Sequence, residues 1–239
     1  MPSEITVALQ EAMELAIANV PAIPGKIYVC PDVSGSMHGP ATGLRKGATS
    51  AVRCIDVAAL VAAAFVRRNT SAEVLPFADD VVKMPRRLNP LDSVMTNAEL
   101  LAGLPSGGTA CSAPLHRLNE EHAKGDLVIV VSDNMSWADF ARPAEARGRG
   151  VSGLASFLGF GSRPTAMAEE WDRFRGRNRD AKLVLIDVQP YGSTPMVERA
   201  DVLNVGGFSD AVFDVVSLFA KGELGAEHWV GVIDGVSLA

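Results

Sequence analysis

Residues 26–37, KIYVCPDVSGSM, decide the fold, because a short apolar run ends there abruptly in an aspartate and two serines. The β-branched and aromatic side chains of the run are typical of a strand that is buried on both faces. Asp32, Ser34 and Ser36 follow at intervals of two residues, so an extended or tightly looped chain turns their oxygens to the same side. One carboxylate and two hydroxyls in this position indicate a site for a hard cation, whose remaining ligands must come from elsewhere.

Two later stretches supply candidates for those remaining ligands. Residues 104–109, LPSGGT, place the hydroxyl of Thr109 directly after a Gly-Gly turn, where one loop can approach another closely. Residues 127–133, LVIVVSD, form a second apolar run that ends in Asp133. Ligands of an open α/β sheet bind outside the carboxyl ends of the strands. We therefore expect Asp133 and Thr109 to meet Asp32 at one edge of the sheet.

These residues carry a resemblance to a known family. DVSGSM, the threonine after GG and the SDN after an apolar strand resemble the metal-ion-dependent adhesion site of von Willebrand factor A (vWA) domains, DxSxS…T…D. GGTACSAPLHR, DLVIVVSDNMSW, AKLVLIDVQPYG and VLNVGGFSDAVFDVV are similar to the vWA domain that ends Ro-type RNA-binding proteins, those with a TROVE module. The resemblance implies five metal ligands: Asp32, Ser34, Ser36, Thr109 and Asp133.

The resemblance also implies a function. A vWA domain of this kind is a non-enzymatic, protein-binding module that holds a divalent cation. The coordination shell of the cation is completed by an Asp or Glu of the partner, or by water. We expect Mg2+, with Mn2+ and Ca2+ as alternatives, and partner contacts from His38, Gly108, Asn134 and Trp137. RNA binding belongs mainly to the TROVE module of such proteins, which this chain does not contain. RNA is therefore expected only indirectly or weakly, as part of a ribonucleoprotein system.

Composition is consistent with one well-buried domain. The chain has 239 residues, of which 48% are hydrophobic and 21% charged. No apolar run reaches the roughly 18 residues of a membrane span, and the N-terminus lacks a signal pattern, so we expect a cytoplasmic protein without a membrane partner. Cys30, Cys54 and Cys111 are odd in number and have no motif spacing, which predicts buried, reduced thiols.

Strands that alternate with helices predict an α/β fold with a doubly wound, mostly parallel sheet, one antiparallel edge strand and helices on both faces. Strands are expected over 27–30, 73–77, 81–84, 127–131, 182–188 and 202–205, and helices over 5–17, 49–68, 96–104, 114–123, 165–177 and 209–221. The expected organisation is an N-terminal amphipathic helix and linker over 1–24, a Rossmann-like vWA domain over 25–222 and a C-terminal extension over 223–239. The first helix either packs on the body or is the remnant of a linker.

Two other functions deserve comparison with metal-dependent protein binding. A strand ending in Asp32 is also found in Mg2+-dependent phosphoryl-transfer enzymes of the haloacid-dehalogenase type, but these need a second acidic residue where Ser34 stands. Direct RNA binding is the other alternative. The net charge of −6 argues against a general nucleic-acid binder, although residues 142–182 carry nine basic and five acidic side chains. Four arginines of this basic segment are candidates: Arg173, Arg175, Arg177 and Arg179.

Overall fold

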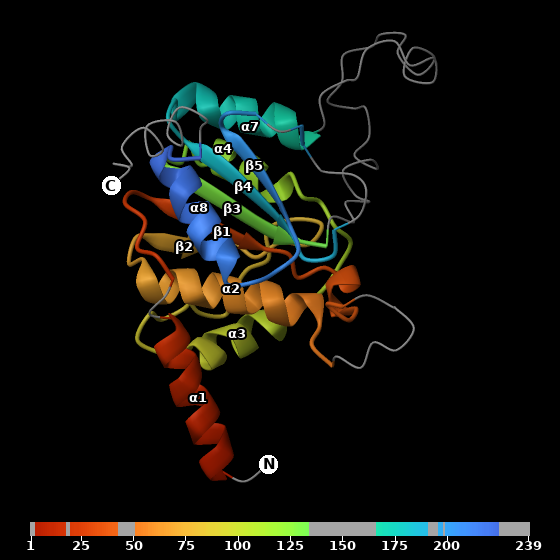
Figure 1. Ribbon diagram of the computed structural model, residues 1–239. Helices are drawn as coiled ribbons and strands as arrows, with labels where there is room; N and C mark the ends of the chain where they lie inside the picture. The colour runs from red at the N-terminus through yellow and green to blue at the C-terminus, as the bar shows by residue number, and fades with distance from the viewer. Residues whose placement is uncertain are drawn as a thin grey trace, which may run out of the picture.

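A parallel sheet forms the centre of the protein. The computed structural model describes residues 3–17, 20–42, 51–133, 166–190, 196–197 and 199–224. Five strands lie in the order β2-β1-β3-β4-β5, and all four pairs of neighbours are parallel (Figure 1). Their bounds are β1 Ile27–Pro31, β2 Ala72–Val74, β3 Leu127–Ser132, β4 Lys182–Asp187 and β5 Val202–Gly206. The carboxyl ends of β1 and β3, which precede Asp32 and Asp133, are therefore neighbours.

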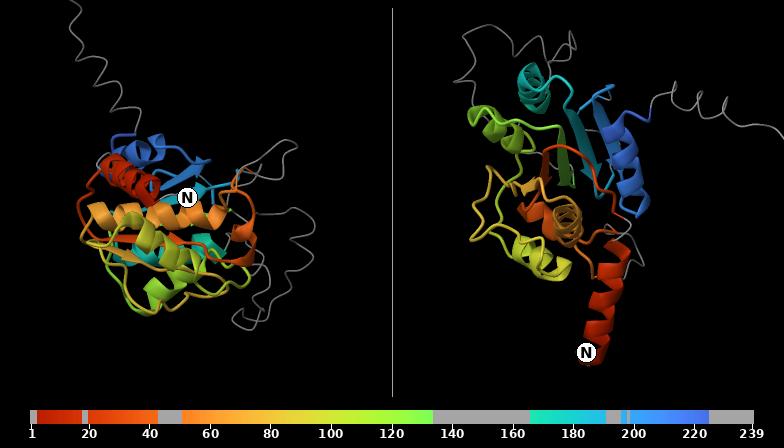
Figure 2. Two further views of the ribbon diagram at one scale, coloured as in Figure 1. Left: turned by 90° about the horizontal axis from the view of Figure 1, so that it is seen from below. Right: turned by 90° about the vertical axis from the view of Figure 1, so that its left-hand side faces the viewer.

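Helices cover both faces of this sheet, as the sequence predicts (Figure 2). The helices are α1 Ser3–Ile17, the 3-10 turn η1 Gly35–His38, α2 Cys54–Arg68, α3 Val94–Ala102, α4 Ala113–Glu120, α7 Ala166–Arg177 and α8 Ala211–Lys221. Successive side chains of a strand point to opposite faces. In β1, Ile27 and Val29 accordingly join one buried cluster, while Tyr28 and Cys30 join the other. The continuous apolar run of this strand is thus explained by burial on both sides.

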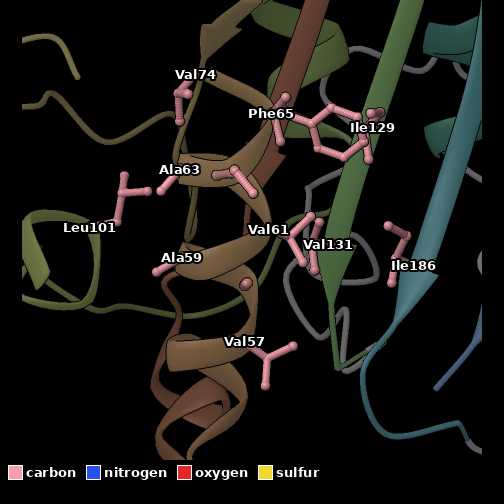
Figure 3. Close-up of a cluster of buried hydrophobic side chains, with 14 of the residues drawn as sticks. Val57, Ala59, Val61, Ala63, Phe65, Val74, Leu101, Ile129, Val131 and Ile186 are labelled. Atoms are coloured by element: carbon pink, nitrogen blue, oxygen red, sulfur yellow. The ribbon is translucent and has the colours of Figure 1, made fainter. Parts of the chain in front are cut away.

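The two clusters differ in the helices that complete them. On one face, α2 and α8 cover the sheet and α3 packs on the outer side of α2 (Figure 1). Phe65 and Val61 of α2 lie beside Ile129 and Val131 of β3 (Figure 3). On the other face, α4 and α7 supply a second cluster that contains the fully buried Trp171. The three cysteines are buried free thiols, as predicted.

The expected antiparallel edge strand is wrong for the described residues. The predicted hairpin of 73–77 and 81–84 is reduced to an isolated antiparallel bridge between Phe77 and Val81. β2 itself runs parallel to β1 and ends at Val74. Pro76 donates no backbone hydrogen bond, and Phe77 instead bridges to Asp32, so the chain turns toward the carboxyl end of β1 before a second strand can pair.

β1 also continues one residue further than a proline at position 31 suggests. Pro31 pairs with Val131, and its carbonyl accepts a hydrogen bond from the Phe77 N–H at 3.1 Å. Its missing N–H would point to the β2 side, where residues 75–77 continue beside β1 after β2 has ended. The Asp32 N–H points the other way and donates to the Val131 carbonyl at 2.8 Å. The proline costs this edge of β1 one possible hydrogen bond, while the neighbouring Leu75 and Phe77 N–H groups still donate to β1.

Two helices begin or pack differently from expectation. α3 starts at Val94, two residues before the predicted start, because the Ser93 hydroxyl accepts the Thr96 N–H at 3.1 Å and caps the helix.

α1 packs only by its C-terminal end, where Glu14 accepts the Val94 N–H at 3.0 Å. The rest of α1 projects from the body, and Leu15 is 76% exposed (Figure 1). α1 is therefore not a further layer on the sheet.

Candidate metal centre

The five predicted ligands come together at the carboxyl end of the sheet. Asp32 and Asp133 follow the adjacent strands β1 and β3, Ser34 directly precedes η1, and Ser36 lies within it. Thr109 lies in the loop between α3 and α4. Four of the five are buried, with exposed fractions of 0% for Asp32 and Ser34, 2% for Thr109 and 3% for Asp133. Ser36 is partly exposed, so one side of the site is open to solvent.

A chain of hydrogen bonds connects all five residues. The Ser34 N–H donates to Asp32 Oδ1 at 2.8 Å, and the Thr109 hydroxyl donates to Ser34 Oγ at 2.8 Å. The hydroxyls of Ser34 and Ser36 are 3.2 Å apart. Ser36 in turn donates to Asp133 Oδ1 at 3.2 Å. Oxygens from three separate stretches of sequence thus form one compact group.

The glycines before Thr109 allow this close approach. The Gly107 carbonyl accepts the Gly35 N–H at 2.9 Å, which ties the loop to the DxSxS turn. A Cβ at Gly107 or Gly108 would lie 2.5 Å or 2.2 Å from a carboxylate oxygen of Asp79. Asp79 therefore lies directly against the loop, on a turn that the sequence presents only as an ordinary pair of aspartates.

Ser132 is a member of the site that the sequence reasoning missed. Its hydroxyl donates to Asp32 Oδ2 at 2.6 Å, so both carboxylate oxygens of Asp32 are held by hydrogen bonds. Cys111 approaches the same hydroxyl, with 3.9 Å between Sγ and Oγ. The available signal was the position of Ser132 at the end of β3, one residue before Asp133 and beside the end of β1.

Burial dominates the electrostatics of Asp32. Loss of solvent raises the pKa of this carboxyl to about 6, although hydrogen bonds from Ser132 and Ser34 act to lower it, and the Asp133 charge raises it further. The metal-free site therefore disfavours the ionised form of Asp32. In the described part of the chain, no group of three or more His, Cys, Asp and Glu side chains is arranged to hold a metal. A cation here would depend on hydroxyl ligands.

The predicted partner contacts are only partly placed. Gly108 is exposed next to Thr109. His38 is exposed at the end of η1, and its Nδ1 lies 3.2 Å from a guanidinium nitrogen of Arg53. Asn134 and Trp137 lie outside the described residues.

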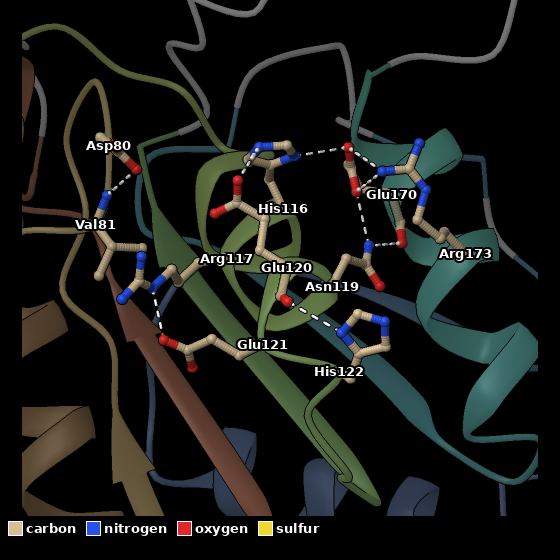
Figure 4. Close-up of polar contacts among 10 residues, drawn as sticks. All are labelled: Asp80, Val81, His116, Arg117, Asn119, Glu120, Glu121, His122, Glu170 and Arg173. Atoms are coloured by element: carbon tan, nitrogen blue, oxygen red, sulfur yellow. Dashed lines mark hydrogen bonds and ion pairs between the residues drawn. The ribbon is translucent and has the colours of Figure 1, made fainter.

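Three of the four candidate arginines already have protein partners, and Arg179 is exposed. Arg173 pairs with Glu170 at 3.3 Å (Figure 4). Arg175 pairs with Asp201, also at 3.3 Å. Arg177 donates to the side chain of an asparagine on α4. These contacts engage charges that a nucleic-acid phosphate would otherwise neutralise.

The lysine that precedes β3 does not face the site. Lys124 donates to the Arg177 carbonyl at 3.2 Å, at the amino end of the strand. Lys124 is thus at the opposite end of the strands from Asp32 and cannot assist a phosphoryl transfer there.

No helix among the described residues is long and apolar enough to cross a membrane.

Comparisons with known proteins agree with this architecture. The family model described as the Ro60 vWA domain matches residues 26–148, which is more than half of the chain. The RNA-binding protein RO60 of Deinococcus radiodurans is 26% identical over 218 residues, covering 91% of this chain and 36% of that protein. The RNA-binding protein RO60 of Caenorhabditis elegans is 23% identical over 224 residues, covering 91% of this chain and 29% of that protein. This chain thus spans about a third of the length of these relatives.

The fold has a solved counterpart. The crystal structure of the Deinococcus radiodurans RO (RSR) protein superposes with a TM-score of 0.64 and 23% identity, over 92% of this chain and 39% of that one. Together with the matched family model, this likeness confirms the resemblance and the parallel α/β architecture expected from the sequence. The chain belongs to the Ro60 vWA domain family.

Proposed function

We propose that this chain is a non-enzymatic, metal-dependent protein-binding module. A divalent cation, with Mg2+ preferred over Mn2+ and Ca2+, is held by Asp32, Ser34, Ser36, Thr109 and Asp133. The remaining coordination position is filled by an Asp or Glu of a protein partner, or by water. The observation that carries the proposal is the continuous group of oxygens that these five side chains form at the carboxyl ends of β1 and β3.

The spacing of the oxygens supports a cation of the size of Mg2+. Neighbouring ligands of an octahedral shell with bonds of about 2.0–2.1 Å lie about 2.9 Å apart, whereas a Ca2+ shell needs wider spacing. The oxygens of Thr109 and Ser34 are 2.8 Å apart. The Ser34–Ser36 and Ser36–Asp133 oxygen pairs are both separated by 3.2 Å. These three separations are compatible with the distance between neighbouring ligands of such a shell.

The balance of charge favours capture of a carboxylate. Two aspartates and three neutral hydroxyls neutralise a divalent cation only weakly if one aspartate acts through water, so the bound cation remains attractive to a further anionic oxygen. The Ser132 hydroxyl donates to Asp32 Oδ2 and keeps that carboxylate oriented while partner carboxylates bind and leave. The exposed side of the site, at Ser36 and Gly108, is where a partner side chain enters.

The relatives suggest the setting of this module. Both curated relatives are named RNA-binding proteins and are about three times as long as this chain. We place this domain in a ribonucleoprotein system in which its own contact is with protein and its contact with RNA is indirect. The pairing of Arg173, Arg175 and Arg177 with neighbouring side chains supports that division.

Calorimetric titration tests the metal site. Mg2+ and Mn2+ are titrated into metal-free protein and into the Thr109→Val and Ser36→Ala variants. We expect binding by the wild type and at least about tenfold weaker binding by both variants, as for loss of a metal-supporting group. Ser71→Ala is the matched control, since its hydroxyl donates to the Gly25 carbonyl at the opposite end of the sheet. Absence of heat in the wild type, or equal heat in the site variants, contradicts the proposal.

A second titration tests the partner carboxylate. A capped peptide with one glutamate is added to isotope-labelled protein, and the amide signals of residues 34–36 are followed by NMR. We expect them to shift in Mg2+ and not in chelator, and a matching glutamine peptide to have no effect. Equal shifts with both peptides would remove the carboxylate from the proposal and leave the metal site intact.

A further inference from the structure

A cavity lies along the free edge of the sheet, and none of the five proposed metal ligands lines it. Its volume is about 560 Å3, within the range of ligand pockets. One wall is formed by β2 and its flanking residues 70–76, and the opposite wall by residues 81–88. This is the place where the sequence predicted an antiparallel edge strand. The chain supplies the segment but holds it away from β2, and a space remains between them.

The edge of β2 presents backbone groups to this cavity. The N–H groups of Leu75 and Phe77 donate to β1 carbonyls at 2.9 Å and 3.1 Å, so the alternate residues Val74 and Pro76 direct their backbone groups away from β1, and of these two only Val74 has an N–H. Among the described residues, none outside β1 hydrogen-bonds to Val74. The groove is closed at its ends, because the Ala72 N–H donates to the Asn69 carbonyl and the Pro76 carbonyl accepts the Val82 N–H. The open stretch is therefore short and centred on Val74.

The cavity is strongly basic in a chain of net charge −6. Its lining includes one acidic residue, Glu73, and these five basic ones: Lys26, Lys83, Arg86, Arg87 and Arg117. Lys26, Arg86 and Arg117 have ion-pair partners within the protein. Lys83 and Arg87 are exposed, and no described acidic side chain pairs with either. Arg117 reaches the cavity from α4, on the same side as Val81 (Figure 4).

We propose that this cavity, which we call the β2 groove, binds an extended acidic peptide segment of a partner protein as an additional strand. The backbone of the segment pairs with Val74, alternate side chains enter the apolar lining formed by Val66, Val82 and Leu88, and the intervening carboxylates meet Lys83 and Arg87. Unpaired edge strands can pair with strands of other chains in this way, and complementary charge determines which chains bind.

The lining favours a peptide over single-stranded RNA. Proteins that hold unpaired bases use aromatic side chains as stacking surfaces. The lining of the β2 groove contains no Phe, Tyr, Trp or His. An unpaired strand edge, in contrast, offers alternating donors and acceptors at the repeat of an extended peptide.

Binding is tested with a short capped peptide of alternating glutamate and valine, labelled with fluorescein and measured by anisotropy. The full chain is kept in chelator, so that carboxylate binding at the metal centre does not contribute and the two proposals fail independently. We expect the Lys83→Glu/Arg87→Glu double variant to bind at least about tenfold more weakly, because two attractive charge contacts become repulsive. Arg179→Glu/Lys221→Glu carries the same change of net charge on exposed residues outside the groove, and we expect less than about twofold loss.

Two N-methylated peptides test the strand pairing itself. Alternate amides of an extended peptide point to opposite edges, so methylation of one set blocks one edge only. We expect one methylated peptide to bind like the parent and the other to lose binding. Equal behaviour of both, or equal effects of the two double variants, overturns the proposal.

Two further results also overturn it. One is tighter binding of a short oligouridine than of the peptide with the same dependence on Lys83 and Arg87, which would assign the groove to RNA. The other is strong hydrogen-exchange protection of the Val74 amide in the free protein, which would mean that residues 81–84 already pair with β2.

Discussion

Replacing Asp32 by asparagine should stabilise the metal-free protein while it abolishes metal binding. Burial raises the pKa of Asp32 from 3.8 to about 6, mainly because the carboxylate has lost its solvent. Each pKa unit corresponds to about 1.4 kcal/mol, so the ionised carboxylate costs the folded state about 3 kcal/mol near neutral pH. Asparagine is nearly isosteric, can still accept the Ser34 N–H and can donate its amide to Ser132. Allowing for weaker hydrogen bonds, we expect a gain of about 1–3 kcal/mol.

The pH dependence of this gain has a definite sign. The folded pKa of Asp32 lies above the unfolded one, so the folded protein takes up a proton first as the pH falls. The penalty is therefore fully present above about pH 6 and disappears toward about pH 4. Urea unfolding followed by circular dichroism in chelator, at several pH values across this window, measures the difference between wild type and variant. Asp180→Asn, an exposed aspartate at the amino end of β4, is the control for removing a surface charge.

Added Mg2+ should reverse the order of stability. At about one thousand times its dissociation constant, a ligand stabilises the protein that binds it by about 4.1 kcal/mol, and the asparagine variant should gain nothing. Lower stability of the variant in chelator at neutral pH would refute the conclusion that burial of the ionised Asp32 carboxylate destabilises the folded protein. So would a difference between the two proteins that is the same at every pH.

Three further substitutions test the fold. Gly25→Ala should cost about 1–2 kcal/mol in thermal or urea unfolding, because Gly25 has φ +95° and a side chain is strained there. Trp171→Phe should cost about 2 kcal/mol by the same assay, because it removes buried volume and a 2.8 Å hydrogen bond to Asp201. Asp56→Asn should cost about 0.5–1 kcal/mol at neutral pH and less near pH 3, because the hydrogen bond from Arg53 holds the pKa of Asp56 low and the benefit decreases as the pH falls toward that lowered pKa. An equal effect of Asp56→Asn at both pH values would contradict this account.

The sheet was predictable because its central strands have clear sequence patterns. A strand buried on both faces needs a continuous apolar run, and residues 27–30 and 127–131 both provide one. Each run ends in an aspartate, and parallel neighbours place such residues together. The fold class and the meeting of Asp32 with Asp133 follow from these features alone.

Details that depend on contacts across the chain were not predictable in the same way. The role of Ser132 depends on the register of β3 against β1, which the residue types do not reveal. Asp79 lies against Gly107 because the chain bends after Pro76, and the same bend cancels the predicted edge strand. A hairpin pattern in sequence describes only local preference, whereas the pairing of an edge strand depends on where the next segment is anchored.

The hydrogen bond from Ser132 to Asp32 joins residues that are 100 positions apart in sequence. Closing so long a segment has an entropic cost that only the completed β1–β3 pairing can offset, so this contact belongs to the late steps of folding. A cation shared by Asp32 and Asp133 would act as a reversible cross-link across the same segment, and its departure would loosen α2, β2, α3 and α4 together. The proposed metal centre would therefore form only in the folded chain, because a chain without β1–β3 pairing does not bring Asp32 and Asp133 together.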